Sequence, residues 1–208
     1  MLGSDGEIHT AAKRGDLEAL KRHVAADPAS KDAAGRFGAT PLISAALSGR
    51  LEVVKYLCEE AGVDTEAGDT YGNTALHMAA SGGKIAVVKY LCAEAKANVE
   101  ALDNYKATPL HSATQAGSID VVRYLCEERK ANKDARERTY GNTPLHVAAK
   151  KGKLEVVKYL CEAGVDKGAY NNDGQTPLRL ARSEKQVRVV KHLGGSCAAF
   201  TTMVCCCF

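Results

Sequence analysis

The stretch from Gly141 to Cys161 reads GNTPLHVAAKKGKLEVVKYLC, and residues 72–92 read GNTALHMAASGGKIAVVKYLC. Both copies place a short alanine-rich segment before a glycine and an aliphatic segment after it. A chain that repeats such a pattern in register is built from similar units rather than around one irregular core.

The repeat extends over most of the chain and has a nearly constant period. Steps of 34, 34, 35 and 33 residues separate Thr40, Thr74, Thr108, Thr143 and Thr176. A second block, LEVVKYLC or a close variant, begins at 51, 85, 119 and 154, and weaker versions begin at 17 and 186. Periods of this size are typical of stacked arrays in which no unit buries its apolar face alone.

Each unit is predicted to contain two helices. In the stretch quoted first, Thr143 is placed to cap the first helix, because a hydroxyl there accepts a hydrogen bond from an orphan amide. Pro144 follows at the first helical position, where its missing N–H costs nothing. Ala148 and Ala149 allow a neighbouring helix to approach closely. Glycines punctuate the units after the first helix at Gly15, Gly49, Gly83, Gly117 and Gly152.

The second helix of that unit is predicted to bury one apolar face. Helical spacing places on this face Leu154, Val157, Leu160 and Cys161. Gly164 is placed to stop the helix in the left-handed conformation. Turn residues such as NNDG at 171–174 predict a projecting hairpin-like loop before the next threonine.

These residues resemble the ankyrin repeat, whose T-P-L-H-x-A core reads TPLHSA at 108 and TPLHVA at 143, with TALHMA at 74 and TPLISA at 40 as close variants. The resemblance implies an all-α solenoid of stacked helix-turn-helix repeats with projecting β-turn loops. It implies an array over residues 1–193, with repeats at approximately 5–34, 35–68, 69–102, 103–137, 138–170 and 171–193. It also implies a non-catalytic scaffold or adaptor for a protein partner, which we expect to be monomeric.

Some positions depart from the repeat. The first unit offers IHTAA from Ile8, without Thr-Pro, and the last unit is polar, as a terminal cap must be to stay soluble. Lysine stands where other units carry glycine at Lys96, Lys106, Lys130 and Lys185. The first three would each cost up to about 1 kcal/mol if their φ angles are positive. An extra loop residue offers relief at Lys96 and Lys130.

The composition is that of a soluble globular chain. Its 208 residues are 45% hydrophobic and 25% charged, with a formal net charge of +3. Nucleic acid is not an expected partner, because the basic residues Lys13, Arg14, Lys150, Lys151 and Lys153 are split between distant repeats and nearly balanced by acidic ones. The N-terminus lacks a signal-peptide pattern, and no apolar run approaches the roughly 20 residues of a membrane-spanning helix. We therefore expect a cytoplasmic or nuclear protein.

The residues that most resemble a metal or catalytic site are better explained by packing. The repeated histidines His77, His111 and His146 are expected to hydrogen-bond the capping threonine and local backbone. Cys58, Cys92, Cys126 and Cys161 recur on successive second helices, too far apart for a disulfide or a zinc site. Tyr56, Tyr90, Tyr124 and Tyr159 are expected to pack with their hydroxyls at the rim. With no phosphate loop and no nucleophile partnered with a base, we expect neither cofactor nor catalysis.

Positions that differ between units are candidates for partner binding, because they do not hold the fold. The residues just before each glycine and those after each TPLH vary in this way and are expected to form a strip on the concave side. The strip contains Leu47, Met78, Ser81, Ser112, Gln115, Lys150 and Lys151, with Ser44 and Val147 at equivalent positions.

A second strip is expected at the turns. Three residues before successive threonines stand Phe37, Tyr71, Tyr105 and Tyr140, with Arg36, Lys106 and Arg138 close by. Aromatic side chains are enriched at interface hot spots. Two interpretations stay open: the rings contact a partner, or each ring packs on the next turn and stiffens the row.

Residues 194–208 fall outside the repeat and are expected to form a disordered, cysteine-rich tail. The last four residues, CCCF, resemble a prenylation box, although cysteines replace the usual aliphatic residues. This gives an alternative function, a lipid-anchored membrane adaptor modified on Cys205, Cys206 and Cys207.

Overall fold

The computed structural model describes residues 6–194, and within this range the regular secondary structure is entirely helical. The helices form consecutive pairs: α1 (Glu7–Arg14) and α2 (Leu17–Ala26), α3 (Pro41–Ser48) and α4 (Leu51–Glu59), α5 (Ala75–Ser81) and α6 (Ile85–Ala93), α7 (Pro109–Ala116) and α8 (Ile119–Glu127), α9 (Pro144–Lys150) and α10 (Leu154–Glu162), α11 (Pro177–Ser183) and α12 (Val187–His192). Two short 3₁₀ turns, η1 (Pro28–Asp32) and η2 (Arg36–Gly38), lie between the first two pairs.

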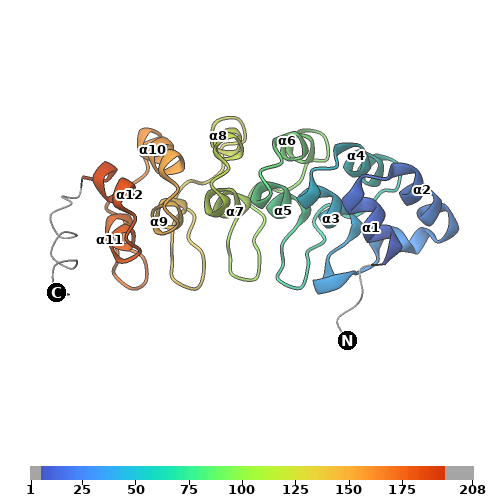
Figure 1. Cartoon of the computed structure of the whole chain (residues 1–208), viewed down its shortest axis with the longest axis horizontal. Helices are drawn as coiled ribbons and strands as arrows, with labels where there is room; N and C mark the ends of the chain where they lie inside the picture. Colours follow the sequence, from blue (N-terminus) through green and yellow to red (C-terminus); the bar gives the residue numbers. More distant parts are fainter. Residues whose placement is uncertain (1–5, 195–208) are drawn as a thin grey trace, which may run out of the picture.

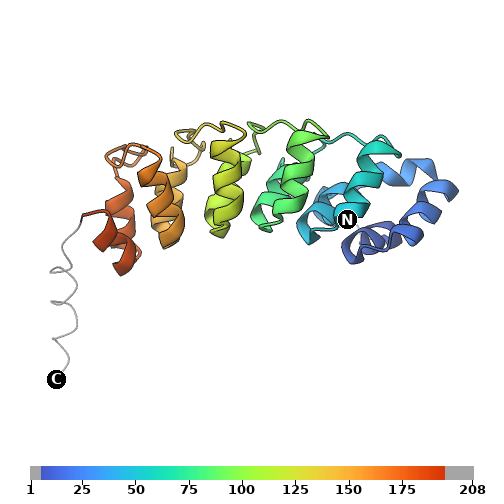
Figure 2. The same ribbon diagram turned by 90° about the horizontal axis from the view of Figure 1, so that it is seen from above.

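The pairs stack in a row (Figure 1). The first helices, from α1 to α11, pack on one another in one layer, and the second helices, from α2 to α12, form another. The loops that lead from one pair to the next project as hairpins on the side of the first-helix layer. Seen from above, the row curves gently (Figure 2). The helical solenoid predicted from the period is confirmed.

The ends of the first helices follow the predicted chemistry. Thr74, Thr108 and Thr143 cap α5, α7 and α9, and each hydroxyl accepts a hydrogen bond from the backbone amide three residues on. Ala148 and Ala149 are fully buried, and α9 packs against both α7 and α11. Small side chains at this point therefore set how closely the repeats stack.

The buried face of the second helices differs from the predicted one. In α10 the side chains at most 6% exposed are Val156, Val157, Tyr159 and Leu160, whereas Leu154 and Cys161 are only half-buried. Leu154 and Cys161 pack against the core as predicted but are only partly covered, and the predicted face missed Val156 and Tyr159. Because α10 packs at once on α9, α8 and α12, its buried arc is wider than one stripe and is centred on the two adjacent valines.

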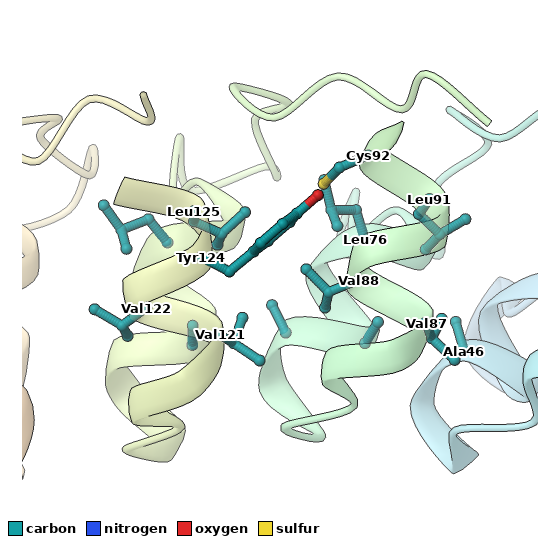
Figure 3. Close-up of a cluster of buried hydrophobic side chains, with 14 of the residues drawn as sticks. Ala46, Leu76, Val87, Val88, Leu91, Cys92, Val121, Val122, Tyr124 and Leu125 are labelled. Carbon is teal, nitrogen blue, oxygen red and sulfur yellow. The ribbon is translucent and has the colours of Figure 1, made fainter. Parts of the chain in front are cut away.

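The same arc is visible in α6 and α8 (Figure 3). Val87, Val88 and Leu91 point from α6 into the core, and the ring of Tyr124 reaches from α8 toward Cys92 on α6. The predicted packing is confirmed for Tyr90, Tyr124 and Tyr159, which are at most 8% exposed, whereas Tyr56 is half-buried. Burial of a large aromatic ring between neighbouring second helices stabilises the stack.

Four lysines occupy left-handed backbone conformations. The φ angles are 54° at Lys96, 57° at Lys106, 56° at Lys130 and 56° at Lys185. The extra loop residue was expected to let Lys96 and Lys130 avoid a positive φ angle, and it does not do so. Phe37, in η2, also has a positive φ of 56°. A side chain in this region is disfavoured relative to glycine.

Candidate functional site

Two hollows lie between the hairpins and the first helices. The first, here called the N-terminal hollow, has a volume of about 430 Å³ and lies at the second and third helix pairs. It brings together five of the predicted binding residues, Arg36, Phe37, Leu47, Tyr71 and Met78. Both predicted strips, one at the turns and one on the first helices, contribute to its wall.

The second, here called the C-terminal hollow, has a volume of about 290 Å³ and lies at the fourth and fifth pairs. It also combines the two strips. Tyr105 and Tyr140 come from the hairpins, Gln115 comes from α7, and Lys150 and Lys151 come from the C-terminal end of α9. The lysine pair that distinguishes the unit quoted first therefore lies beside two tyrosines.

Not every predicted binding residue lines a hollow. Ser81 and Ser112 lie outside both, as do Lys106 and Arg138, which are exposed in the hairpins next to the tyrosines. Ser44, at the position equivalent to Met78, lines the N-terminal hollow but is only 3% exposed.

The hairpins are joined in a row through their backbones. The carbonyl oxygens of Phe37 and Tyr71 accept hydrogen bonds at 2.9 Å from the amides of Thr70 and Asn104. The carbonyls of Tyr105 and Tyr140 likewise accept from the next hairpin. The backbone ladder thus ties each aromatic residue to its neighbour without using the ring.

The aromatic side chains themselves are half-exposed. The exposed fractions are 42% for Phe37, 47% for Tyr71, 52% for Tyr105 and 48% for Tyr140. Within residues 6–194, the only rings in contact are those of Phe37 and Tyr71, with centroids 6.4 Å apart. Each of the four rings is thus about half covered by the protein and half open to the solvent.

Three carboxylates that the sequence analysis did not single out shape the hairpins. Asp69 and Asp103 each accept hydrogen bonds from the backbone amides two and four residues on. Glu137 accepts from the amides of Thr139, Tyr140 and Asn142. An acidic residue two positions before an aromatic one, as in Asp69-Thr70-Tyr71, is the signal of such a turn in the sequence.

The repeated histidines link one unit to the next. In each of the third, fourth and fifth units, Nδ1 accepts from the threonine amide at the helix N-terminus. Nε2 then carries the proton and lies 3.0–3.1 Å from the carbonyl oxygen of Ala107, Asn142 or Gln175 in the next unit. Burial lowers the pKa of His77, His111 and His146 below the usual histidine value. The predicted structural role of these histidines is confirmed.

Family models describe the same repeat. A model for three copies of the ankyrin repeat matches residues 8–103 and 61–137, and a model for many copies matches residues 134–181. The chain belongs to the ankyrin-repeat family. Ankyrin repeats are generally protein–protein interaction modules and are typically non-catalytic. A search of curated proteins found no match.

Burial disfavours the thiolate form of the cysteines inside the ankyrin array. Cys58, Cys92, Cys126 and Cys161 are free. Burial raises the pKa of Cys58, Cys92 and Cys126 to about 11 and raises that of Cys161. Since the thiolate is the nucleophile and metal ligand, these groups are poorly suited to either role near neutral pH.

Residues 6–194 contain no cluster of three or more histidine, cysteine or acidic side chains arranged to hold a metal ion. The same residues include no helix with the length and apolar character needed to span a bilayer. Cys205, Cys206 and Cys207, on which the lipid-anchor alternative rests, lie outside the described residues.

Proposed function

We propose that this ankyrin array is a non-catalytic adaptor that binds a partner protein along its hairpin side. One observation carries the proposal: the two hollows combine the aromatic residues of the hairpins with the variable residues of the first helices. Two sets of residues selected for different reasons thus converge on one surface.

The physical character of this surface supports protein binding. Half-exposed aromatic rings supply a large contact area and have few rotatable bonds to order, so they lose little conformational entropy on binding. The backbone ladder between hairpins holds the rings in a fixed row. A partner therefore meets a preorganised surface, and we propose that a single copy of the chain provides it.

The test compares partner capture by the intact chain with capture by the variant Tyr71→Ala/Tyr105→Ala/Tyr140→Ala. We expect cellular proteins retained by the intact chain to be lost from the variant, while its thermal unfolding curve is nearly unchanged, because the removed rings are half-exposed. Tyr170→Ala is the matched control, since Tyr170 is 65% exposed in a hairpin but lies outside both hollows.

Two results would contradict the proposal. Retention of the same proteins by the variant and the intact chain would place binding elsewhere. A large loss of stability in the triple variant would instead show that the rings are structural. Light scattering of the purified chain tests the monomeric state separately.

A further inference from the structure

The N-terminal hollow lies at the one interface between units that lacks the histidine link. The position held by His77, His111 and His146 is occupied in the second unit by Ile43, which lines the hollow. The linking histidine of the first unit, His9, contacts the carbonyl oxygens of Ala33 and Ala39. Within residues 6–194, only the second and third units are thus joined without an imidazole from the first helix.

Apolar side chains gather on one part of this hollow, although Lys13, Arg36 and Asp69 also line it. Ile43, Leu47 and Met78 from the first helices face the rings of Phe37 and Tyr71. Leu47 is 38% exposed, although it lies in a helix that is otherwise well buried. The hollow therefore offers a pocket in which an apolar side chain from outside would leave water.

The C-terminal hollow is lined by a pair of neighbouring lysines, whereas Lys13 and Arg36 line the N-terminal hollow beside its apolar residues. Lys150 and Lys151 form this pair, and the Lys150 ammonium lies 5.3 Å from the centre of the Tyr140 ring. Lys106 and Arg138 extend the positive charge along the same hairpins. Among the described residues, Lys106, Arg138 and the two neighbouring lysines form no ion pair with a carboxylate.

The acidic residues on this side are already bonded within their own hairpins. Asp103 and Glu137 line the C-terminal hollow, but they accept two and three backbone hydrogen bonds respectively. The first helices α3, α5, α7 and α9, which lie behind the hairpins, contain no acidic residue. The hairpin side is therefore complementary to a negatively charged partner.

We infer that the partner segment is an extended acidic peptide with one apolar anchor, an inference that rests on the proposed function. The apolar side chain occupies the N-terminal hollow, and a group of acidic residues lies against Lys150 and Lys151. The two hollows are two helix pairs apart, and packed helices have axes about 8–10 Å apart, which gives about 16–20 Å. An extended chain advances about 3.3 Å per residue, so about five or six residues separate the two features.

The test is selection from phage-displayed random peptides of about sixteen residues, long enough to span both hollows, on the immobilised full chain. We expect enrichment of peptides that combine an aliphatic or aromatic residue with an acidic group at the spacing given above. The affinity of a selected peptide is then measured by fluorescence polarisation. Lys150→Ala/Lys151→Ala should weaken it about tenfold, and added salt should weaken it too.

Two further variants show whether peptide affinity depends on the residues of the hollows or on any exposed side chain. Leu47→Ser should weaken the peptide about threefold or more, because it makes the wall of the N-terminal hollow polar. Lys89→Ala/Lys167→Ala is the matched control, since it removes two exposed lysines outside both hollows, and it should leave affinity unchanged.

Other outcomes overturn the inference. Enrichment of basic or uncharged peptides that still require the tyrosines would refute the acidic partner and leave the proposed function standing. Equal binding of duplex DNA, with the same loss in the lysine variant, would show a general attraction for polyanions. If no peptide is enriched, the inference fails, and the proposed function is then decided by protein capture with the tyrosine variant.

Discussion

His111 and Asn142 are joined across a repeat boundary: His111 Nε2 lies 3.1 Å from the carbonyl oxygen of Asn142. Nδ1 of the same imidazole accepts a hydrogen bond from the backbone amide of Thr108. One side chain thus closes the N-terminus of its own helix and holds the hairpin of the next unit. Local helix capping and long-range stacking depend on the same ring.

Replacing His111 with alanine should lower the free energy of unfolding by about 1–3 kcal/mol, because it leaves buried backbone groups without partners. Arg179→Ala is the matched control: Arg179 occupies the same position in the last unit but is exposed, and we expect a change within about 0.5 kcal/mol. Urea unfolding measures both. Equal effects of the two substitutions would show that the link does not stabilise the stack.

Stability should fall on mild acidification. The folded-state pKa of His77, His111 and His146 is lowered by burial, so the unfolded chain binds protons at higher pH than the folded chain. The free energy of unfolding should therefore be highest above the unfolded histidine pKa of about 6.5 and decrease as pH falls through it.

Urea unfolding between about pH 7.5 and pH 5, above the range in which carboxylates titrate, measures this dependence. The variant His77→Gln/His111→Gln/His146→Gln should show a smaller slope, since glutamine does not titrate. A stability that is constant or increases on acidification in the intact chain would contradict the assignment of neutral, buried imidazoles.

The first unit lacks a threonine cap, and its histidine therefore lacks one of the hydrogen bonds that the other units make. Gly6 stands at the cap of α1, and Nδ1 of His9 is buried without a hydrogen-bond partner. Gly6 has φ −64° and ψ 167°, and an added Cβ would meet no atom closer than His9 Nδ1 at 3.7 Å. Gly6→Thr should therefore raise the free energy of unfolding by about 1 kcal/mol.

Thermal and urea unfolding measure this gain. Gly15→Thr provides the contrast, because Gly15 has φ 82° and an added Cβ would lie 2.9 Å from the Arg50 side chain. That substitution should destabilise the chain. A loss of stability in Gly6→Thr would show that His9 does not adopt the capping arrangement of the other units.

The left-handed lysines give an independent test of backbone strain. Lys96→Gly and Lys130→Gly should each stabilise the chain by up to about 1 kcal/mol, because glycine adopts positive φ without a steric penalty. Lys89→Gly, in the interior of α6, should destabilise it by about the same amount. Thermal unfolding distinguishes the two signs, and destabilisation by all three would mean that the loop lysines are not strained.

The sequence by itself determined the pairing and order of the α-helices within residues 6–194 and how most of the first helices begin. Thr143, Pro144 and Gly152 act within one turn of their own positions, so their effects follow from local chemistry and recur with the period. The tertiary structure decided which surfaces meet. Three features depend on contacts between units about thirty residues apart. They are the deeper burial of Val156 than of Leu154, the link from His111 to Asn142, and the two hollows. Such contacts are set by the angle and distance at which neighbouring helices pack, and the spacing of residues along one helix does not contain that information.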